Sequence, residues 1–191
     1  MAEQPIALRE WAVAVRALEQ GRQAIALRKG GISEETKEFR LESTGFYLFP
    51  SCEHQRPELV KPEWRPVVGE TKEEAAREPD TVRIGVYAEA VSDIEVTDAE
   101  TLGRLDECHI WTGSYAEERL RWKKTKPLHV LLLRAYRLGQ PFEVPLRESY
   151  GGCKSWIRLE DEPPGGERLP VLTDAEFAAA ADEVERAIRG R

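Results

Sequence analysis

The 191-residue sequence is poor in cysteine and lacks any long hydrophobic run. Its three cysteines form no CxxC pair, and this odd, irregular set indicates reduced thiols rather than a disulfide framework. The apolar stretch Val130–Leu133 is far shorter than the roughly 20 residues that a membrane-spanning helix needs. Because the N-terminus also has neither the basic nor the apolar region of a signal peptide, we expect a cytoplasmic protein with no membrane partner.

The common signatures of catalysis are missing as well. The sequence contains no GxxxxGKS/T phosphate loop, no GxGxxG, no GxSxG, no HExxH and no EF-hand loop. The spacing of Cys52, Cys108 and Cys153 matches no structural zinc pattern, so we expect neither a metal site nor a cofactor. The sequence leaves open whether the protein is an enzyme.

The chain does contain an ordinary globular composition with a rich supply of aromatic residues. Hydrophobic residues make up 41% and charged residues 33%, with five Trp and five Tyr. A chain of this length can bury a core without disulfides. We expect one α+β domain over residues 1–160. A linker and a C-terminal helix that packs on this domain then occupy 161–191, because the prolines and glycines at 163–166 mark a break.

Hydrophobic periodicity predicts helices at both ends of the chain and strands between them. Leu8, Trp11 and Val15 recur at spacings of three and four, which predicts an N-terminal helix. Thr173 and Glu176 form a capping-box pattern that predicts the start of the last helix. The strands at 39–42 and 46–49 should form a hairpin within a mixed or mostly antiparallel sheet. The predicted helices cover 6–20, 71–77, 98–105, 115–124 and 173–189, the predicted strands 23–28, 39–42, 46–49, 81–91, 129–138, 142–146 and 155–159, and a predicted loop 33–37.

Positive charge gathers in one segment, although the net charge of the chain is −7. Between Tyr115 and Arg137 seven basic residues stand against two acids. On the predicted helix Tyr115, Arg119 and Trp122 share one face. Such a face suits single-stranded nucleic acid, because rings stack on bases while cations contact phosphates. The competing interpretation is that the rings pack on the sheet and the cations only solvate the helix.

A candidate acid–base pair follows the predicted strand at 46–49. Glu53 and His54 open a proline-rich stretch, and histidine titrates near neutrality. Together with His109 they suggest an alternative function, a metal-assisted hydrolase or nuclease. An ordinary surface histidine is the competing interpretation of His54.

The segment Tyr150–Trp156 combines two glycines with flanking rings. Glycines let a backbone approach a ligand. The competing interpretation is a sharp turn with both rings in the core.

We predict a binding module for single-stranded nucleic acid or a nucleotide-like ligand. A third hypothesis is a protein partner docked on an exposed patch of Trp residues. The residues predicted to bind are Arg28, Lys29, His54, Gln55, Trp111, Arg119, Trp122, Lys123, Arg134, Tyr150 and Trp156.

Six short stretches stand in a characteristic order along residues 8–159. They are LREWAV at 8–13, LRKGGI at 27–32, LFP at 48–50 with EHQ at 53–55, HIW at 109–111, VLLLR at 130–134 and YGGCKSW at 150–156. In this order they resemble domain of unknown function 1802, a group of uncharacterised bacterial proteins. The resemblance implies a bacterial source and no particular activity.

A helix followed by the stretch from Gly21 to Arg28 suggests a second, weaker resemblance. It is similar to the opening of ASCH and other PUA-like domains, whose strand carries a Gly, a Lys, a Glu and an Arg in that order. Gly21 and Arg28 fit this pattern, whereas Gln23 stands in place of the Lys and Ala26 in place of the Glu. The resemblance implies a small PUA-like β-barrel, and many such domains bind RNA or modified bases.

Overall fold

A single curled sheet organises the protein. The computed structural model describes residues 4–29, 39–122 and 125–190. In the described part the sheet has seven strands in the order β2-β5-β4-β3-β1-β6, with β7 paired to β5. Every pair is antiparallel except β1 with β3. The strands are β1 (Ile6–Trp11), β2 (Ile25–Arg28), β3 (Gly45–Ser51), β4 (Thr81–Val96), β5 (Leu128–Pro145), β6 (Trp156–Arg158) and β7 (Arg168–Pro170).

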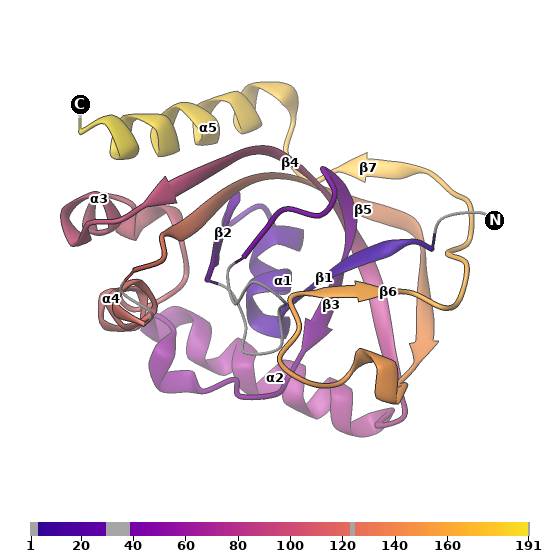
Figure 1. Ribbon diagram of the computed structural model, residues 1–191. Coiled ribbons are helices and arrows are strands. Elements are labelled where there is room, and N and C mark those ends of the chain that lie inside the picture. The colour runs from indigo at the N-terminus through magenta and orange to yellow at the C-terminus, as the bar shows by residue number, and fades with distance from the viewer. Residues whose placement is uncertain (1–3, 30–38, 123–124, 191) are drawn as a thin grey trace.

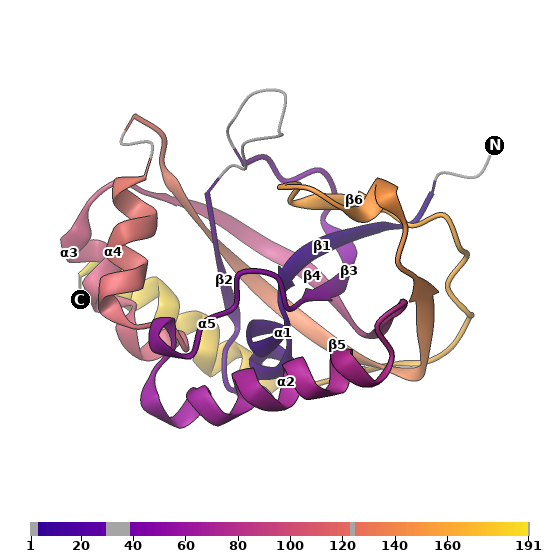
Figure 2. The same cartoon turned by 90° about the horizontal axis from the view of Figure 1, so that it is seen from below.

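The helices divide into two groups around this sheet (Figures 1 and 2). Helix α1 lies within the curl, where it packs on β3 and β5, and α2 covers it from outside. The other helices gather at one end of the molecule, where α3 contacts both α4 and α5. The helices are α1 (Ala12–Glu19), α2 (Arg65–Arg77), α3 (Ala99–Arg104), α4 (Gly113–Arg121) and α5 (Asp174–Arg189), and the short 3-10 turns are Pro57–Leu59, Pro62–Trp64, Asp106–Cys108 and Glu148–Tyr150.

The predicted α+β class with a mostly antiparallel sheet is confirmed. The sheet curls without closing, because no ladder joins the end strands β2 and β6 in the described residues. The architecture is therefore an open half-barrel. In the same part of the chain, no helix reaches the length and apolarity required to span a membrane.

The predictions for β2, β4, α3, α4 and α5 are confirmed to within a few residues, except that β4 continues to Val96 and α4 starts at Gly113. The α5 capping box forms as predicted, with the Thr173 hydroxyl accepting from the Glu176 N–H. Helix α2 is longer than the predicted 71–77, and the two strands predicted at 129–138 and 142–146 form one strand, β5. The loop predicted over 33–37 lies outside the described residues.

Two predictions at the N-terminal side are wrong. Residues Ile6–Trp11 form β1 rather than the first turns of a helix, because they pair with β3 on one side and β6 on the other. The predicted hairpin is absent among the described residues, since 39–42 belongs to no strand and β3 pairs instead with β1 and β4. In both cases partners distant in sequence decided the local conformation.

The C-terminal residues attach to the rest at two places. Strand β7 pairs with β5, and α5 packs against α3 and β5. The division of the chain near residue 160 stays a prediction.

Substitution of two glycines by alanine should change the stability of the fold in opposite directions. A Cβ on Gly45 in β3 would overlap the Tyr87 hydroxyl oxygen, whereas a Cβ on Gly69 in α2 would meet nothing within 4 Å. We expect Gly45→Ala to lower the free energy of unfolding by about 1–3 kcal/mol through overpacking. We expect Gly69→Ala to raise it by about 0.5–1 kcal/mol through helix propensity. Urea unfolding measures both changes. Adding Tyr87→Phe should recover most of the Gly45→Ala loss, and an unchanged loss would contradict the overlap.

Candidate functional site

A cleft of about 620 Å³ opens beside the ends of β1 and β2. The segment after β3, helix α4 and the turn before β6 complete its walls. Six Lys or Arg side chains line it against two Glu, although the whole chain is acidic. The lining residues that carry charge or a large ring are Arg9, Glu10, Trp11, Arg28, Lys29, Glu53, His54, Arg56, Trp111, Tyr115, Arg119, Trp122 and Lys154.

A buried ion pair lies at the inner end of this cleft. Arg28 Nη1 lies 3.2 Å from Glu10 Oε2, and both side chains are about nine-tenths buried. The other carboxylate oxygen of Glu10 accepts the Trp11 backbone N–H at 2.7 Å. The Arg28 guanidinium also lies over the Phe39 ring, 5.6 Å from its centroid. Because β1 and β2 are not neighbours in the sheet, this pair joins two strands across the curl.

Aromatic rings form one wall of the cleft. Trp11, Trp111 and Tyr115 contact one another, with ring centroids 4.9–5.6 Å apart. Burial raises the pKa of the Tyr115 phenol, so its hydroxyl stays protonated at neutral pH. Trp122 ends this wall with 37% of its surface exposed, and the Arg119 guanidinium lies 5.4 Å from its ring. A partly exposed ring beside a cation is suited to stacking on a planar ligand.

The opposite rim is held by Arg9. Its guanidinium pairs with Glu53 at 2.7 Å and donates to the Gly152 carbonyl oxygen. The turn after β3 is thereby tied to the turn before β6. His54 follows in a left-handed backbone conformation, with φ at 62°, which turns the chain away from the strand.

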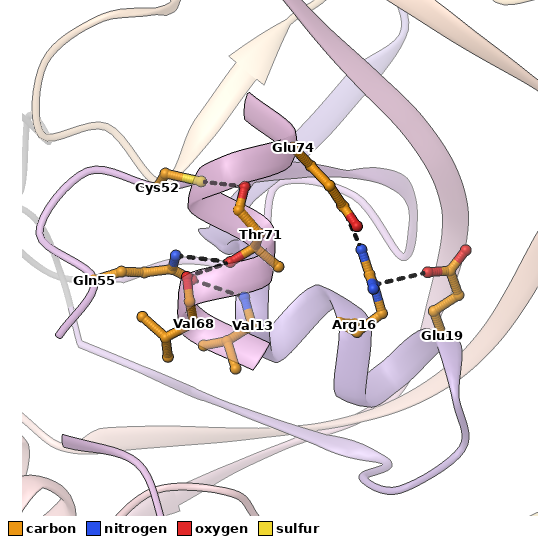
Figure 3. Close-up of polar contacts among 8 residues, drawn as sticks. All are labelled: Val13, Arg16, Glu19, Cys52, Gln55, Val68, Thr71 and Glu74. Atoms are coloured by element: carbon orange, nitrogen blue, oxygen red, sulfur yellow. Dashed lines mark hydrogen bonds and ion pairs between the residues drawn. The ribbon is translucent and has the colours of Figure 1, made fainter. Parts of the chain in front are cut away.

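Gln55 anchors this turn through hydrogen bonds to α1 and α2 (Figure 3). Its side-chain oxygen accepts the Val13 N–H at 2.8 Å, and its amide donates to the Thr71 hydroxyl at 3.1 Å. The Thr71 hydroxyl in turn donates to the Val68 carbonyl oxygen. Gln55 therefore links α1 to α2 and positions the neighbouring Glu53 and His54, rather than lining the cleft itself.

A larger cavity of about 730 Å³ lies on the other side of the same strand end. Pro50 and Cys52 face it, whereas Ser51 and Glu53 line the cleft. Its four arginines are matched by four glutamates, and Arg16 pairs with both Glu74 and Glu19 (Figure 3). Because these charges balance, this cavity has no comparable attraction for an anion.

The cleft brings together most of the residues that the sequence singled out for binding. Helix α4 carries Arg119. The Thr112 hydroxyl caps the start of this helix by accepting the Tyr115 N–H. At the end of β2, Lys29 donates to the Leu120 carbonyl oxygen at 2.7 Å, which joins β2 to α4. The predicted residues that line the cleft are Arg28, Lys29, Glu53, His54, Trp111, Arg119 and Trp122.

Two predicted aromatic residues lie in the core instead. Tyr150 is 1% exposed, and its hydroxyl accepts the Glu160 N–H. Trp156 is 9% exposed, and its ring N–H donates to the Arg40 carbonyl oxygen at 2.7 Å. The turn between them, which includes Lys154, reaches the cleft. The interpretation of this segment as a turn with both rings buried therefore fits its geometry.

Arg134 also lies outside the cleft. Its guanidinium pairs with Asp174 at the start of α5 and lies over the Phe177 ring. These contacts assign it to the attachment of the C-terminal helix. Lys123 lies outside the described residues.

His109 does not join Glu53 and His54. It is 4% exposed, and neither ring nitrogen has a hydrogen-bond partner in the part of the chain that the structure describes. Burial, with a smaller effect of Lys61, lowers the pKa of His109 to about 4. Burial also raises the pKa of the adjacent Cys108 thiol to about 11. Within residues 4–29, 39–122 and 125–190, no group of three or more His, Cys, Asp or Glu side chains could hold a metal ion.

Sequence reasoning missed Arg9, Glu10 and Trp11 as site residues. The helix predicted over residues 6–20 gave no reason to expect that these three side chains would line one cleft. All three lie in the stretch LREWAV, one of those that carry the family resemblance. That stretch was the available signal.

Comparisons with known proteins give a family match and two similar solved structures. A family model described as "Domain of unknown function (DUF1802)" matches residues 7–183. A search of curated proteins finds no match. Crystal structures of two variants of ZmASCH from Zymomonas mobilis are similar to the chain at 12% and 11% identity, with TM-scores of 0.46 and 0.47. Each alignment covers 94% of this chain and 98% or 96% of the other.

The burial of His109 predicts a specific pH dependence of stability. Its folded pKa of about 4 lies below the ordinary value of 6.5, so between these values the unfolded chain binds a proton that the folded chain does not. The free energy of unfolding should therefore fall as the pH drops through this window, by up to about 1.4 kcal/mol per pH unit from this group. Urea unfolding of His109→Gln should show a flatter profile than the unmodified protein. His54→Gln, at an exposed site, is the matched control, and equal slopes in all three proteins would contradict the assignment.

Proposed function

The chain belongs to the domain of unknown function 1802 family, and because that description assigns no activity, we propose from the cleft itself that the protein binds nucleotides, either free or within a single-stranded nucleic acid. The observation that carries the proposal is the excess of cations in a cleft that also presents aromatic rings. Phosphates need the cations, and bases need the rings, so both requirements meet in one place.

Charge makes the cleft distinctive within this protein. The chain has a net charge of −7, yet six cations line the cleft against two carboxylates. Glu53 is already paired with Arg9, and Glu10 with Arg28. A cleft lined mostly by one sign of charge concentrates ligands of the opposite sign. An anionic ligand is therefore favoured over a neutral or cationic one.

The rings narrow the ligand class further. Trp122 is exposed beside Arg119, so a planar group can stack on it while an anion contacts the guanidinium. Stacking of a base on an aromatic ring contributes about 1–3 kcal/mol. The cleft volume of about 620 Å³ lies within the range of roughly 300–1,000 Å³ typical of small-ligand pockets.

The two other hypotheses have less support. A metal-assisted hydrolase would need His109 beside Glu53 and His54, but His109 is buried away from the cleft. A partner docked on a tryptophan patch would need several exposed Trp rings. Among the described residues the exposed large apolar side chains are Val91, Trp122, Leu146 and Leu169.

The proposal predicts how binding of a short single-stranded oligonucleotide responds to salt and to two substitutions. Affinity measured by fluorescence anisotropy should fall steeply as salt rises, because phosphate contacts release counterions. Arg119→Ala should weaken binding and reduce the slope of log K against log salt by about 0.7. Trp122→Ala should weaken binding about ten-fold and leave that slope unchanged, because a ring contributes stacking without charge.

Lys72→Ala is the matched control, since Lys72 is exposed on α2 and does not line the cleft. It should bind like the unmodified protein. Absence of binding at low salt, or an affinity that ignores salt, would contradict the proposed function.

A further inference from the structure

We propose that the Glu10–Arg28 pair reads the base of the bound nucleotide and selects guanine. This inference rests on the proposed function of the cleft and names the ligand that it prefers. The observation behind it is that the buried carboxylate of Glu10 and the buried guanidinium of Arg28 lie side by side at the inner end of a cationic cleft. Bare phosphate binding would need only the cations, and beyond joining β1 to β2 the buried carboxylate has acceptor positions left for a ligand.

Glu10 differs from the other acid of the cleft in its burial. The Glu53 side chain is 62% exposed on the rim and pairs there with Arg9, whereas the Glu10 side chain is 7% exposed. Each carboxylate oxygen of Glu10 accepts one hydrogen bond, from the Trp11 N–H and from Arg28. A carboxylate has about four acceptor positions, so both oxygens retain a free one. Glu10 can therefore accept two further hydrogen bonds from a ligand.

Arg28 places donors next to these acceptors. Only its Nη1 has a hydrogen-bond partner among the described residues, and its buried Nε has none there. A guanidinium carries five N–H donors in a fixed plane. Because Nε is enclosed by protein, the donors left for a ligand are those of Nη1 and Nη2, next to the acceptors of Glu10.

Guanine has the complementary edge. Its imino N1–H and amino N2–H are adjacent donors that can reach the two oxygens of one carboxylate, and its O6 is an acceptor beside them. Uracil has one imino N–H between two carbonyl oxygens, so one oxygen would face the carboxylate. Adenine and cytosine each offer a single amino donor on this edge. Guanine therefore satisfies more of the buried groups than any other common base.

Burial gives this match its selectivity. A site with buried polar groups rejects a ligand that leaves them unpaired, because the ligand has removed water without replacing its hydrogen bonds. Trp11 follows Glu10 in the chain and lies on the same cleft with Tyr115, which gives the base an apolar boundary. The cations nearer the rim, such as Arg119 and Lys154, remain for the phosphate.

The test compares three mononucleotides on the full chain by isothermal titration calorimetry at one low salt concentration. They are GMP, IMP, which lacks only the exocyclic amino group, and UMP. We expect IMP to bind about ten-fold more weakly than GMP, because one hydrogen bond to a charged group is lost. UMP should bind more weakly still. Glu10→Gln should lower the affinity for GMP about ten-fold and reduce the GMP-to-IMP ratio to about two. Lys72→Ala, at an exposed position on α2 that does not line the cleft, should keep the ratio of the unmodified protein.

The outcomes separate the inference from the proposed function. Equal affinities for GMP, IMP and UMP, or tighter binding of IMP or UMP, would overturn guanine selection and leave nucleotide binding intact. Absence of binding for all three nucleotides would overturn guanine selection, and it would overturn the proposed function as well if the oligonucleotide also fails to bind at low salt. Because the ranking is measured first on the unmodified protein, it decides the question even if Glu10→Gln does not fold.

Discussion

The contact on which the site depends is the ion pair between Glu10 and Arg28. It joins β1 to β2, strands separated by three others in the sheet order, and it does so with both side chains buried. Burial of two charges costs several kcal/mol each, and removal of one partner typically costs about 3–5 kcal/mol. No ladder joins the end strands β2 and β6 in the described residues, and this charged pair links β2 to β1 across the curl of the half-barrel.

Around this pair the fold directs side chains from five places in the chain at one cleft. β1 contributes Arg9 to the rim, β2 ends in Arg28, and α4 contributes Arg119. The turn after β3 is held from behind by Gln55, which links α1 to α2. Hydrogen bonds between α1 and α2 therefore support this turn, while the cations and Trp122 line the cleft.

Local patterns predicted the parts of the fold that local forces determine. The capping box of Thr173 and the apolar centre of β5 could be predicted from the sequence, because each depends on residues that are neighbours along the chain. Strand β1 could not be predicted from the sequence, because the spacing of Leu8 and Trp11 suits a helix. Only pairing with β3 and β6 makes residues 6–11 a strand. Glu10 was missed for the same reason. Arg119 and Trp122 could be singled out as candidates because a basic segment with rings is visible without any knowledge of the fold.

The most direct measurement is a map of backbone amide NMR shifts during titration with a short single-stranded oligonucleotide at low salt. If the cleft is the binding site, the largest shifts should cluster at Glu10 in β1, Arg28 in β2, and Arg119 and Trp122 at the C-terminal end of α4, which only the fold brings together. Shifts that gather instead around Arg16 and Glu74, in the charge-balanced cavity, or a spectrum that does not change, would contradict it.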